Sequence, residues 1–195
     1  KLLPNLTKLT IQGKPIDTLS HLSPLSKLVV LDLTKCQFPS HDLSVLASLP
    51  ALSSLTLDTC GLSTIEDLEG ARNLTHLNLA NNTIRNLDVL AGMTTLNELN
   101  LDHNAVTTVA ALSGLENLSK LTLNYNALTT LEPLAGCIKL SHLEADHNQL
   151  GTLSGMGKLS LLTHLSVDYN QLVNVSALAH STELVNLSIA SNAIA

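Results

Sequence analysis

The sequence predicts a repeat solenoid of α/β type, a right-handed, curved stack of short parallel strands with 3-10 or extended segments on its convex side. One eleven-residue pattern recurs nine times along the 195-residue chain, at intervals of 22 residues with one interval of 24. The chain is 45% hydrophobic but only 2% aromatic. A core of this size with so few rings must repeat one aliphatic residue, and the recurring residue is leucine.

The nine copies of the pattern begin at residues 6, 28, 52, 74, 96, 118, 140, 162 and 184. The seventh reads LSHLEADHNQL, and the shared form is L-x-x-L-x-L-x-x-N-x-L. In this form the chain resembles the leucine-rich repeat family over essentially its full length. The resemblance implies a curved solenoid whose strands line the concave face, and one strand is expected in each unit.

Alternation predicts the strand. In Leu143-Glu144-Ala145 and its equivalents, the first and third side chains are expected to point inward and the middle one outward. Strands of successive units should then pair in parallel. Ala145 stands where other units have a larger core residue, so less volume is expected in that layer.

An asparagine recurs where the chain turns away from each strand. Its amide is expected to bond backbone groups of neighbouring turns. Six units carry it: Asn82, Asn104, Asn126, Asn148, Asn170 and Asn192. Cys36 and Cys60 take this place in units two and three, and Lys14 takes it in unit one. Buried free thiols are expected there, with a Cys36–Cys60 disulfide as the alternative. An odd total of three cysteines favours a reducing compartment.

The returning half of each unit repeats every three residues, as in Ile84, Leu87 and Leu90. This period predicts 3-10 turns or extended segments rather than full α-helices. Together with phrases such as LEPLAG and NLTHLNL, the 22-residue form resembles bacterial internalins. It is also similar to the leucine-rich regulatory subunit of type-1 protein phosphatase.

One domain of nine units is predicted over residues 1–195. We expect a segment of a longer protein whose caps lie outside it, because the pattern starts and stops within a unit and solenoids need polar terminal caps. Unit two has two extra residues, in FPSHDL, which predict a bulge on the convex side at 39–42.

The outward residues of units five to eight form the candidate binding surface. From unit three onward this face carries six acids and one base, Lys120. Both tyrosines also lie on it, and tyrosine is common among the residues that dominate binding energy. A protein partner that carries Lys or Arg is therefore predicted. The predicted partner-binding residues are Glu98, Asp102, His103, Tyr125, His142, Glu144, Asp146, His147, His164, Asp168 and Tyr169.

The same face offers metal ligands as a minor alternative. His142 and His164 are neighbours in one column, about 5 Å apart, and zinc binding by this pair would use Glu144 or Asp146 as a further ligand. Because strand-face side chains are expected to project in parallel rather than converge, no metal and no cofactor is predicted.

Two further chemistries are disfavoured. Calcium binding along the aspartate column would be interrupted by Asn124. No candidate nucleophile on a strained turn and no oxyanion donors can be identified, so no enzyme is predicted.

The formal net charge of −6 argues against a nucleic-acid partner, since phosphate binding needs a basic patch. No apolar run approaches the length that membrane insertion requires. The favoured function is therefore non-enzymatic protein recognition through the concave face. The likeness to internalins implies a bacterial cell-surface or secreted module. Two alternatives remain open, an intracellular scaffold or phosphatase-regulator-like adaptor, and a rigid spacer between flanking domains.

Overall fold

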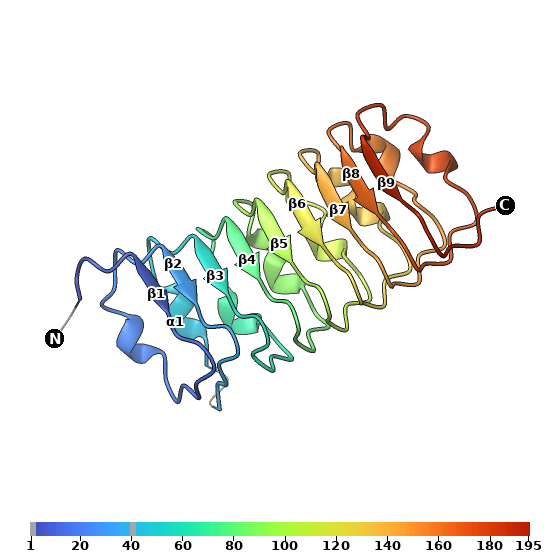
Figure 1. The fold of residues 1–195 in the computed structure, drawn as a ribbon. Coiled ribbons are helices and arrows are strands. Elements are labelled where there is room, and N and C mark those ends of the chain that lie inside the picture. Colours follow the sequence, from blue (N-terminus) through green and yellow to red (C-terminus); the bar gives the residue numbers. More distant parts are fainter. Residues whose placement is uncertain (1–2, 40–41) are drawn as a thin grey trace.

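The computed structural model describes residues 3–39 and 42–195, and in them every unit contributes one three-residue strand to a single open sheet (Figure 1). All neighbouring strands are parallel and follow one another in chain order. The strands are β1 Lys8–Thr10, β2 Val30–Asp32, β3 Ser54–Thr56, β4 His76–Asn78, β5 Glu98–Asn100, β6 Lys120–Thr122, β7 His142–Glu144, β8 His164–Ser166 and β9 Asn186–Ser188. The predicted parallel solenoid is confirmed.

The pairing register places equivalent residues of successive units side by side. His142 of β7 pairs with Lys120 of β6 on one side and with His164 of β8 on the other. The strand begins one residue earlier than the predicted 143–145 and ends with Glu144. The alternation is as predicted, because Leu143 and Ala145 are buried while Glu144 lies on the outer face.

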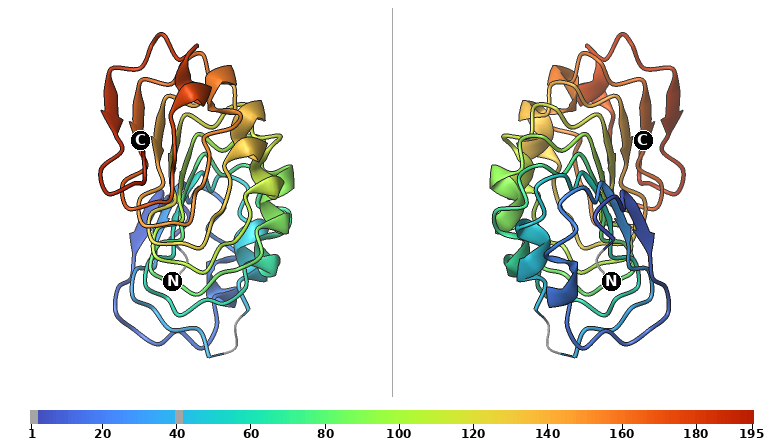
Figure 2. Two further views of the ribbon diagram at one scale, coloured as in Figure 1. Left: turned by 90° about the vertical axis from the view of Figure 1, so that its right-hand side faces the viewer. Right: turned by 90° about the vertical axis from the view of Figure 1, so that its left-hand side faces the viewer.

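The convex side consists of short 3-10 helices, as the period of three predicts. They lie opposite the sheet (Figure 2) and are η1 Ser20–Leu22, η2 Glu66–Leu68, η3 Asp88–Gly92, η4 Ala110–Leu112, η5 Glu132–Gly136, η6 Met156–Lys158 and η7 Ser176–Leu178. The unit with two extra residues instead has a single α-helical turn, α1 Ser44–Ala47. Of the bulge predicted at 39–42, Ser40 and His41 lie outside the described residues.

The core is a stack of aliphatic layers between the sheet and the convex turns. The inward strand leucines Leu99, Leu121 and Leu143 are at most 2% exposed. Phe38 is the one aromatic residue in this core. Burying a leucine side chain stabilises a fold by roughly 1.5–3 kcal/mol, so repetition of leucine replaces the missing rings.

The asparagine column has the structural role predicted for it. Asn148 donates from Nδ2 to the carbonyl oxygens of Leu123, Ala145 and Asp146 at 2.9, 3.2 and 3.1 Å. Its Oδ1 accepts the Leu128 N–H at 3.0 Å. One buried amide therefore ties the backbone of its own unit to that of the preceding unit.

The cysteines are free, buried thiols, so the alternative of a Cys36–Cys60 disulfide is wrong for this structure. Cys36 and Cys60 each donate from Sγ to a backbone carbonyl of the preceding unit, of Ile11 and Leu33, at 3.2 Å. Burial raises the pKa of the Cys60 and Cys137 thiols to about 11. Such thiols are protonated and shielded at neutral pH, which gives them little reactivity in any compartment.

Candidate functional site

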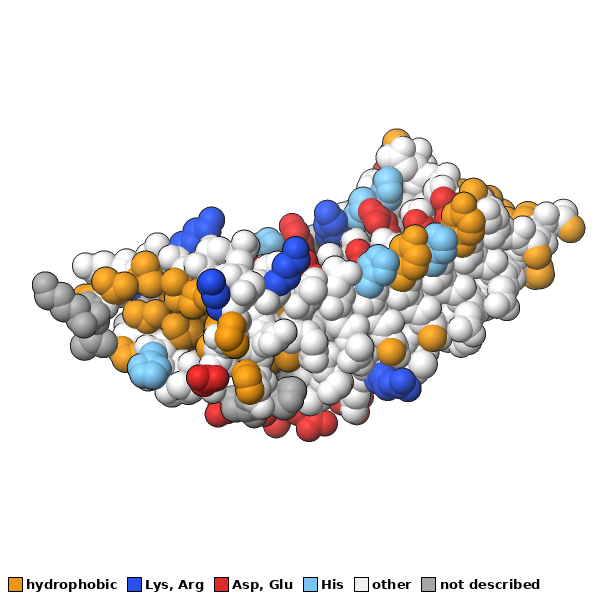
Figure 3. Space-filling model, turned by 60° about the horizontal axis from the view of Figure 1, so that its bottom comes forward, with side chains coloured by type: hydrophobic (Ala, Val, Ile, Leu, Met, Phe, Trp, Pro, Cys, Tyr) orange, Lys and Arg blue, Asp and Glu red, His pale blue; other side chains and the backbone are white. Residues whose placement is uncertain are grey.

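A row of four stacked rings lies at the carboxyl ends of β5 to β8. We call it the ring row, and it consists of His103, Tyr125, His147 and Tyr169. Successive ring centroids are 4.2 Å apart, and the ring planes meet at 9–11°. The alternation is visible in Figure 3 as pale-blue and orange side chains along the hollowed side. Tyr125 and Tyr169 are 46% and 55% exposed, which leaves ring surface for a partner.

The backbone produces this stack. Each ring-row residue has a left-handed conformation, with φ between 52° and 57°, and the equivalent positions in the other units also have positive φ. The backbone N–H of Tyr125 donates to the Asp146 carbonyl of the next unit at 2.9 Å, and His147 bonds Asp168 in the same way. A left-handed residue other than glycine costs about 1–2 kcal/mol. Because every unit repeats this turn, the four side chains leave the backbone in the same way and stack.

The acidic residues beside the ring row have structural roles that sequence reasoning missed. Asp102 accepts the backbone N–H of Asn124 at 2.7 Å, and the Asn124 side-chain oxygen accepts the Asp146 N–H at 2.8 Å. Asp146 and Asp168 continue the pattern with the N–H groups of Asp168 and Ala190, at 2.7 and 2.6 Å. In the sequence, Asp and Asn interchange at this position. The two side chains share an acceptor oxygen, so the interchange indicates that this position accepts a hydrogen bond.

Burial raises the pKa of the Asp102 carboxyl, although the hydrogen bond from Asn124 opposes the rise. Asp146 also accepts the Ser166 hydroxyl, at 2.7 Å. These carboxylates are thus held in place by the sheet, and they present a fixed row of negative charge next to the rings.

A second cluster lies on β7 and β8. The rings of His142 and His164 stack at 4.3 Å, and His142 Nε2 lies 2.8 Å from Glu144 Oε1. Ligand-type atoms of all three side chains lie within 4.8 Å of one another, so these side chains converge even though they rise from the face of a sheet. Asp146, the other acid considered for this cluster, is not a member of it in the described structure.

Glu144 is positioned by two neighbours. Asn124 donates from Nδ2 to Glu144 Oε2 at 3.0 Å, while His142 contacts the other oxygen. Burial raises the pKa of Glu144, but the hydrogen bonds from His142 and Asn124 outweigh it, so that the pKa is lowered overall. The cluster therefore holds an ionised carboxylate against two imidazoles at neutral pH.

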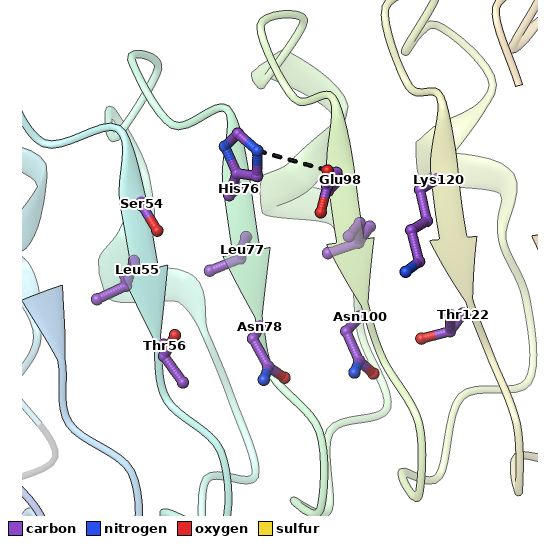
Figure 4. A pocket seen from close by; sticks show the side chains of 11 residues that line it. Ser54, Leu55, Thr56, His76, Leu77, Asn78, Glu98, Asn100, Lys120 and Thr122 are labelled. Atoms are coloured by element: carbon purple, nitrogen blue, oxygen red, sulfur yellow. Dashed lines mark ion pairs between the residues drawn. The ribbon is translucent and has the colours of Figure 1, made fainter. Parts of the chain in front are cut away.

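A shallow depression of about 230 Å³ lies on the sheet over β3 to β6 (Figure 4). His76 Nε2 and Glu98 Oε1 lie 3.6 Å apart in it, and Lys120 forms its far side. Among the predicted binding residues only Glu98 lines this depression. It is also lined by three polar residues that were not predicted: His76 and Asn78 on β4, and Asn100 on β5.

All eleven predicted binding residues thus lie on the sheet or directly after its strands. They form separate groups: the ring row, the aspartate row of Asp102, Asp146 and Asp168, the cluster of His142, Glu144 and His164, and Glu98 in the depression. Within the part of the chain that the structure describes, no helix is long and apolar enough to cross a membrane.

The model of the family "Leucine Rich repeats (2 copies)" matches residues 72–116. Internalin C2 of Listeria monocytogenes is 30% identical, with a TM-score of 0.89, over 94% of this chain and 80% of that one. No curated protein matches in sequence.

Two further solved structures are similar. An internalin of L. monocytogenes, InlF, is 27% identical with a TM-score of 0.70, over 97% of this chain and 68% of its own. A leucine-rich repeat protein of Leptospira interrogans is 25% identical with a TM-score of 0.88, over 99% of this chain and 51% of its own. The chain therefore belongs to the leucine-rich repeat proteins. Within them it resembles the internalins, and this fold supports protein–protein recognition in general.

Proposed function

We propose that this chain is a non-enzymatic recognition module that binds a protein partner carrying Lys or Arg through its concave face, over β5 to β8. The observation that carries the proposal is the ring row. Four stacked rings with two half-exposed tyrosines offer a rigid, amphipathic contact surface that loses little side-chain entropy on binding.

The neighbouring charges select the partner. Asp146 and Asp168 are held beside the rings by backbone and side-chain hydrogen bonds. A guanidinium or ammonium group can stack on a tyrosine and reach a carboxylate in the adjacent row. A basic partner surface therefore complements the charge of this face.

The likeness to internalins favours a cell-surface or secreted location in a bacterium. The three cysteines do not oppose it, because all of them are buried and a shielded thiol is compatible with either redox environment.

The test is a comparative pull-down from cell lysate and from isolated cell-surface proteins, read by mass spectrometry. The baits are the wild type and the double variant Tyr125→Ala/Tyr169→Ala. The aspartates are left intact because they bond the backbone of the next unit. We expect proteins that the wild type retains to bind the variant at least about tenfold more weakly, and to be released by raised salt.

The matched control is Ile138→Ala/Leu161→Ala. Both residues are 51% exposed, close to the tyrosines, but they precede the strands rather than follow them: Ile138 lies between η5 and β7, and Leu161 lies between η6 and β8. Circular dichroism should show that all three baits are folded. The control should retain the same proteins as the wild type. Identical protein sets from the wild type and the tyrosine variant would reject the concave-face proposal and favour a spacer.

A further inference from the structure

His142, Glu144 and His164 bring two imidazoles and one carboxylate together on the concave face. We propose that these three side chains bind one divalent metal ion of the zinc class, with a fourth coordination position open toward the concave side. The proposal stands apart from protein recognition, and its test needs no partner.

The distances suit such an ion. Zinc lies about 2.0–2.2 Å from nitrogen and oxygen ligands, so tetrahedral ligand atoms are about 3.3 Å apart. His142 Nε2 and Glu144 Oε1 are already 2.8 Å apart, and all three ligand atoms lie within 4.8 Å of one another. Side-chain rotation is enough to close the set, because β7 and β8 are paired with His142 opposite His164.

An outer hydrogen bond already orients the carboxylate. Asn124 donates to Glu144 Oε2 at 3.0 Å, which leaves Oε1 for the metal. Support of this kind raises the affinity of metal ligands. The side chains of His142 and Glu144 are only 29% and 32% exposed, so the ion would be partly shielded from water.

The surrounding charges are mixed. Lys120 is the neighbour of His142 on β6, and its positive charge disfavours a bound cation. Asn186, the neighbour of His164 on β9, is neutral. Asp146 lies close by in the next row, where it accepts the Ser166 hydroxyl. Two histidines and one carboxylate are a known ligand set for zinc with an open position. The set lacks the six to eight oxygen ligands that calcium takes.

A second histidine–carboxylate pair on the same sheet serves as a control for this site. His76 of β4 and Glu98 of β5 also bring an imidazole and a carboxylate together, at 3.6 Å, but among the described residues no third ligand completes that group. A merely exposed imidazole would bind metal equally well at both places, whereas a three-ligand site predicts a difference.

The experiment measures Zn²⁺ binding to the folded chain at pH 7.5 by competition with a chromogenic chelator. We expect one ion per chain. His164→Gln and Glu144→Gln should each weaken binding by at least about tenfold, and His76→Gln should leave it unchanged.

Cobalt gives a second readout. Co²⁺ bound to the wild type should show the visible absorption of a four- or five-coordinate site, and this absorption should be absent from His142→Gln. Equal Zn²⁺ affinity in the wild type, His142→Gln and His164→Gln would overturn the proposal. So would an equal loss in His76→Gln, since that result indicates adventitious binding by surface histidines. Circular dichroism should confirm that each variant is folded.

Discussion

At the scale of single residues, one asparagine per unit satisfies backbone groups that no strand pairing reaches. Asn148 is 8% exposed and makes four hydrogen bonds to the backbone, to its own unit and to the preceding one. The thiol of Cys60, in the equivalent place, donates to the carbonyl oxygens of Leu33 and Asp58, at 3.2 and 3.5 Å. The amide thus supplies both donors and an acceptor, whereas a thiol supplies a weak donor.

Replacing Asn148 with alanine should lower the free energy of unfolding by about 3 kcal/mol, because buried carbonyl and N–H groups lose their partner. Urea unfolding followed by circular dichroism would measure it. Asn186→Ala, on the exposed part of β9, should change stability by less than about 0.5 kcal/mol. Equal effects of the two substitutions would contradict the role given to the buried amide.

The pKa values of two carboxyl groups on the concave face should be shifted in opposite directions by folding. The pKa of Glu144 is lowered from 4.5, since the hydrogen bonds from His142 and Asn124 outweigh burial, and the pKa of Asp102 is raised from 3.8 chiefly by burial. Glu144 therefore contributes stability that is present above pH 4.5 and lost as the pH falls through its folded pKa. Asp102 contributes stability that is present below pH 3.8 and lost as the pH rises through its folded pKa.

Carboxyl carbon chemical shifts, followed by NMR between pH 2 and pH 7, would check this prediction. Asn124→Ala removes the amide that donates to Glu144, so it should raise the pKa of Glu144 toward 4.5. An unchanged Glu144 titration in that variant would show that Asn124 does not hold the carboxylate.

At the scale of elements, short strands and 3-10 turns follow directly from the periods of two and three in the sequence. The strand bounds differ from the prediction by one residue, since β7 spans His142–Glu144 rather than 143–145. The α-helical turn α1 was not predicted. Two added residues in that unit allow a helical turn where the others have room for a 3-10 turn.

Contacts between convex turns decide where glycine is required. Gly114 and Gly136 occupy equivalent positions in successive units. A Cβ built on Gly136 would fall on the carbonyl oxygen of Ser113, whereas a Cβ on Gly114 meets nothing within 4 Å. Identical residues at one repeat position are therefore under different constraints.

Gly136→Ala should lower the free energy of unfolding by about 2 kcal/mol, since η5 must move away from the preceding turn. Gly114→Ala should be neutral or should stabilise by about 0.5 kcal/mol, through the lower entropy of the unfolded chain. Thermal and urea unfolding of the pair would measure both. A loss in Gly114→Ala as large as that in Gly136→Ala would indicate a general intolerance of side chains at this position.

At the scale of the whole molecule, the curved sheet brings the ring row and the cluster of His142, Glu144 and His164 onto one side. Acidic, basic and histidine side chains line the hollowed side, a second group of acidic side chains lies on the opposite side (Figure 3), and leucines fill the interior. The chain has few aromatic residues, and both of its tyrosines lie in a single row on the hollowed side. This distribution is what makes the concave face a stronger candidate for binding than the convex turns.

The repeat in the sequence was sufficient to predict the parallel solenoid, the 3-10 turns, the leucine core and the asparagine column. Each of these depends on which residues are equivalent from unit to unit, and the recurring pattern, at intervals of 22 residues with one of 24, specifies that equivalence. The repeat alone did not predict that the ring row stacks, because stacking also requires the left-handed backbone at Tyr125 and its equivalents. The convergence of His142, Glu144 and His164, and the backbone hydrogen bonds of the aspartate row, depended on side-chain orientation. Periodicity determines which residues become neighbours, but rotamers and hydrogen-bond partners are chosen only when the neighbouring units are packed together.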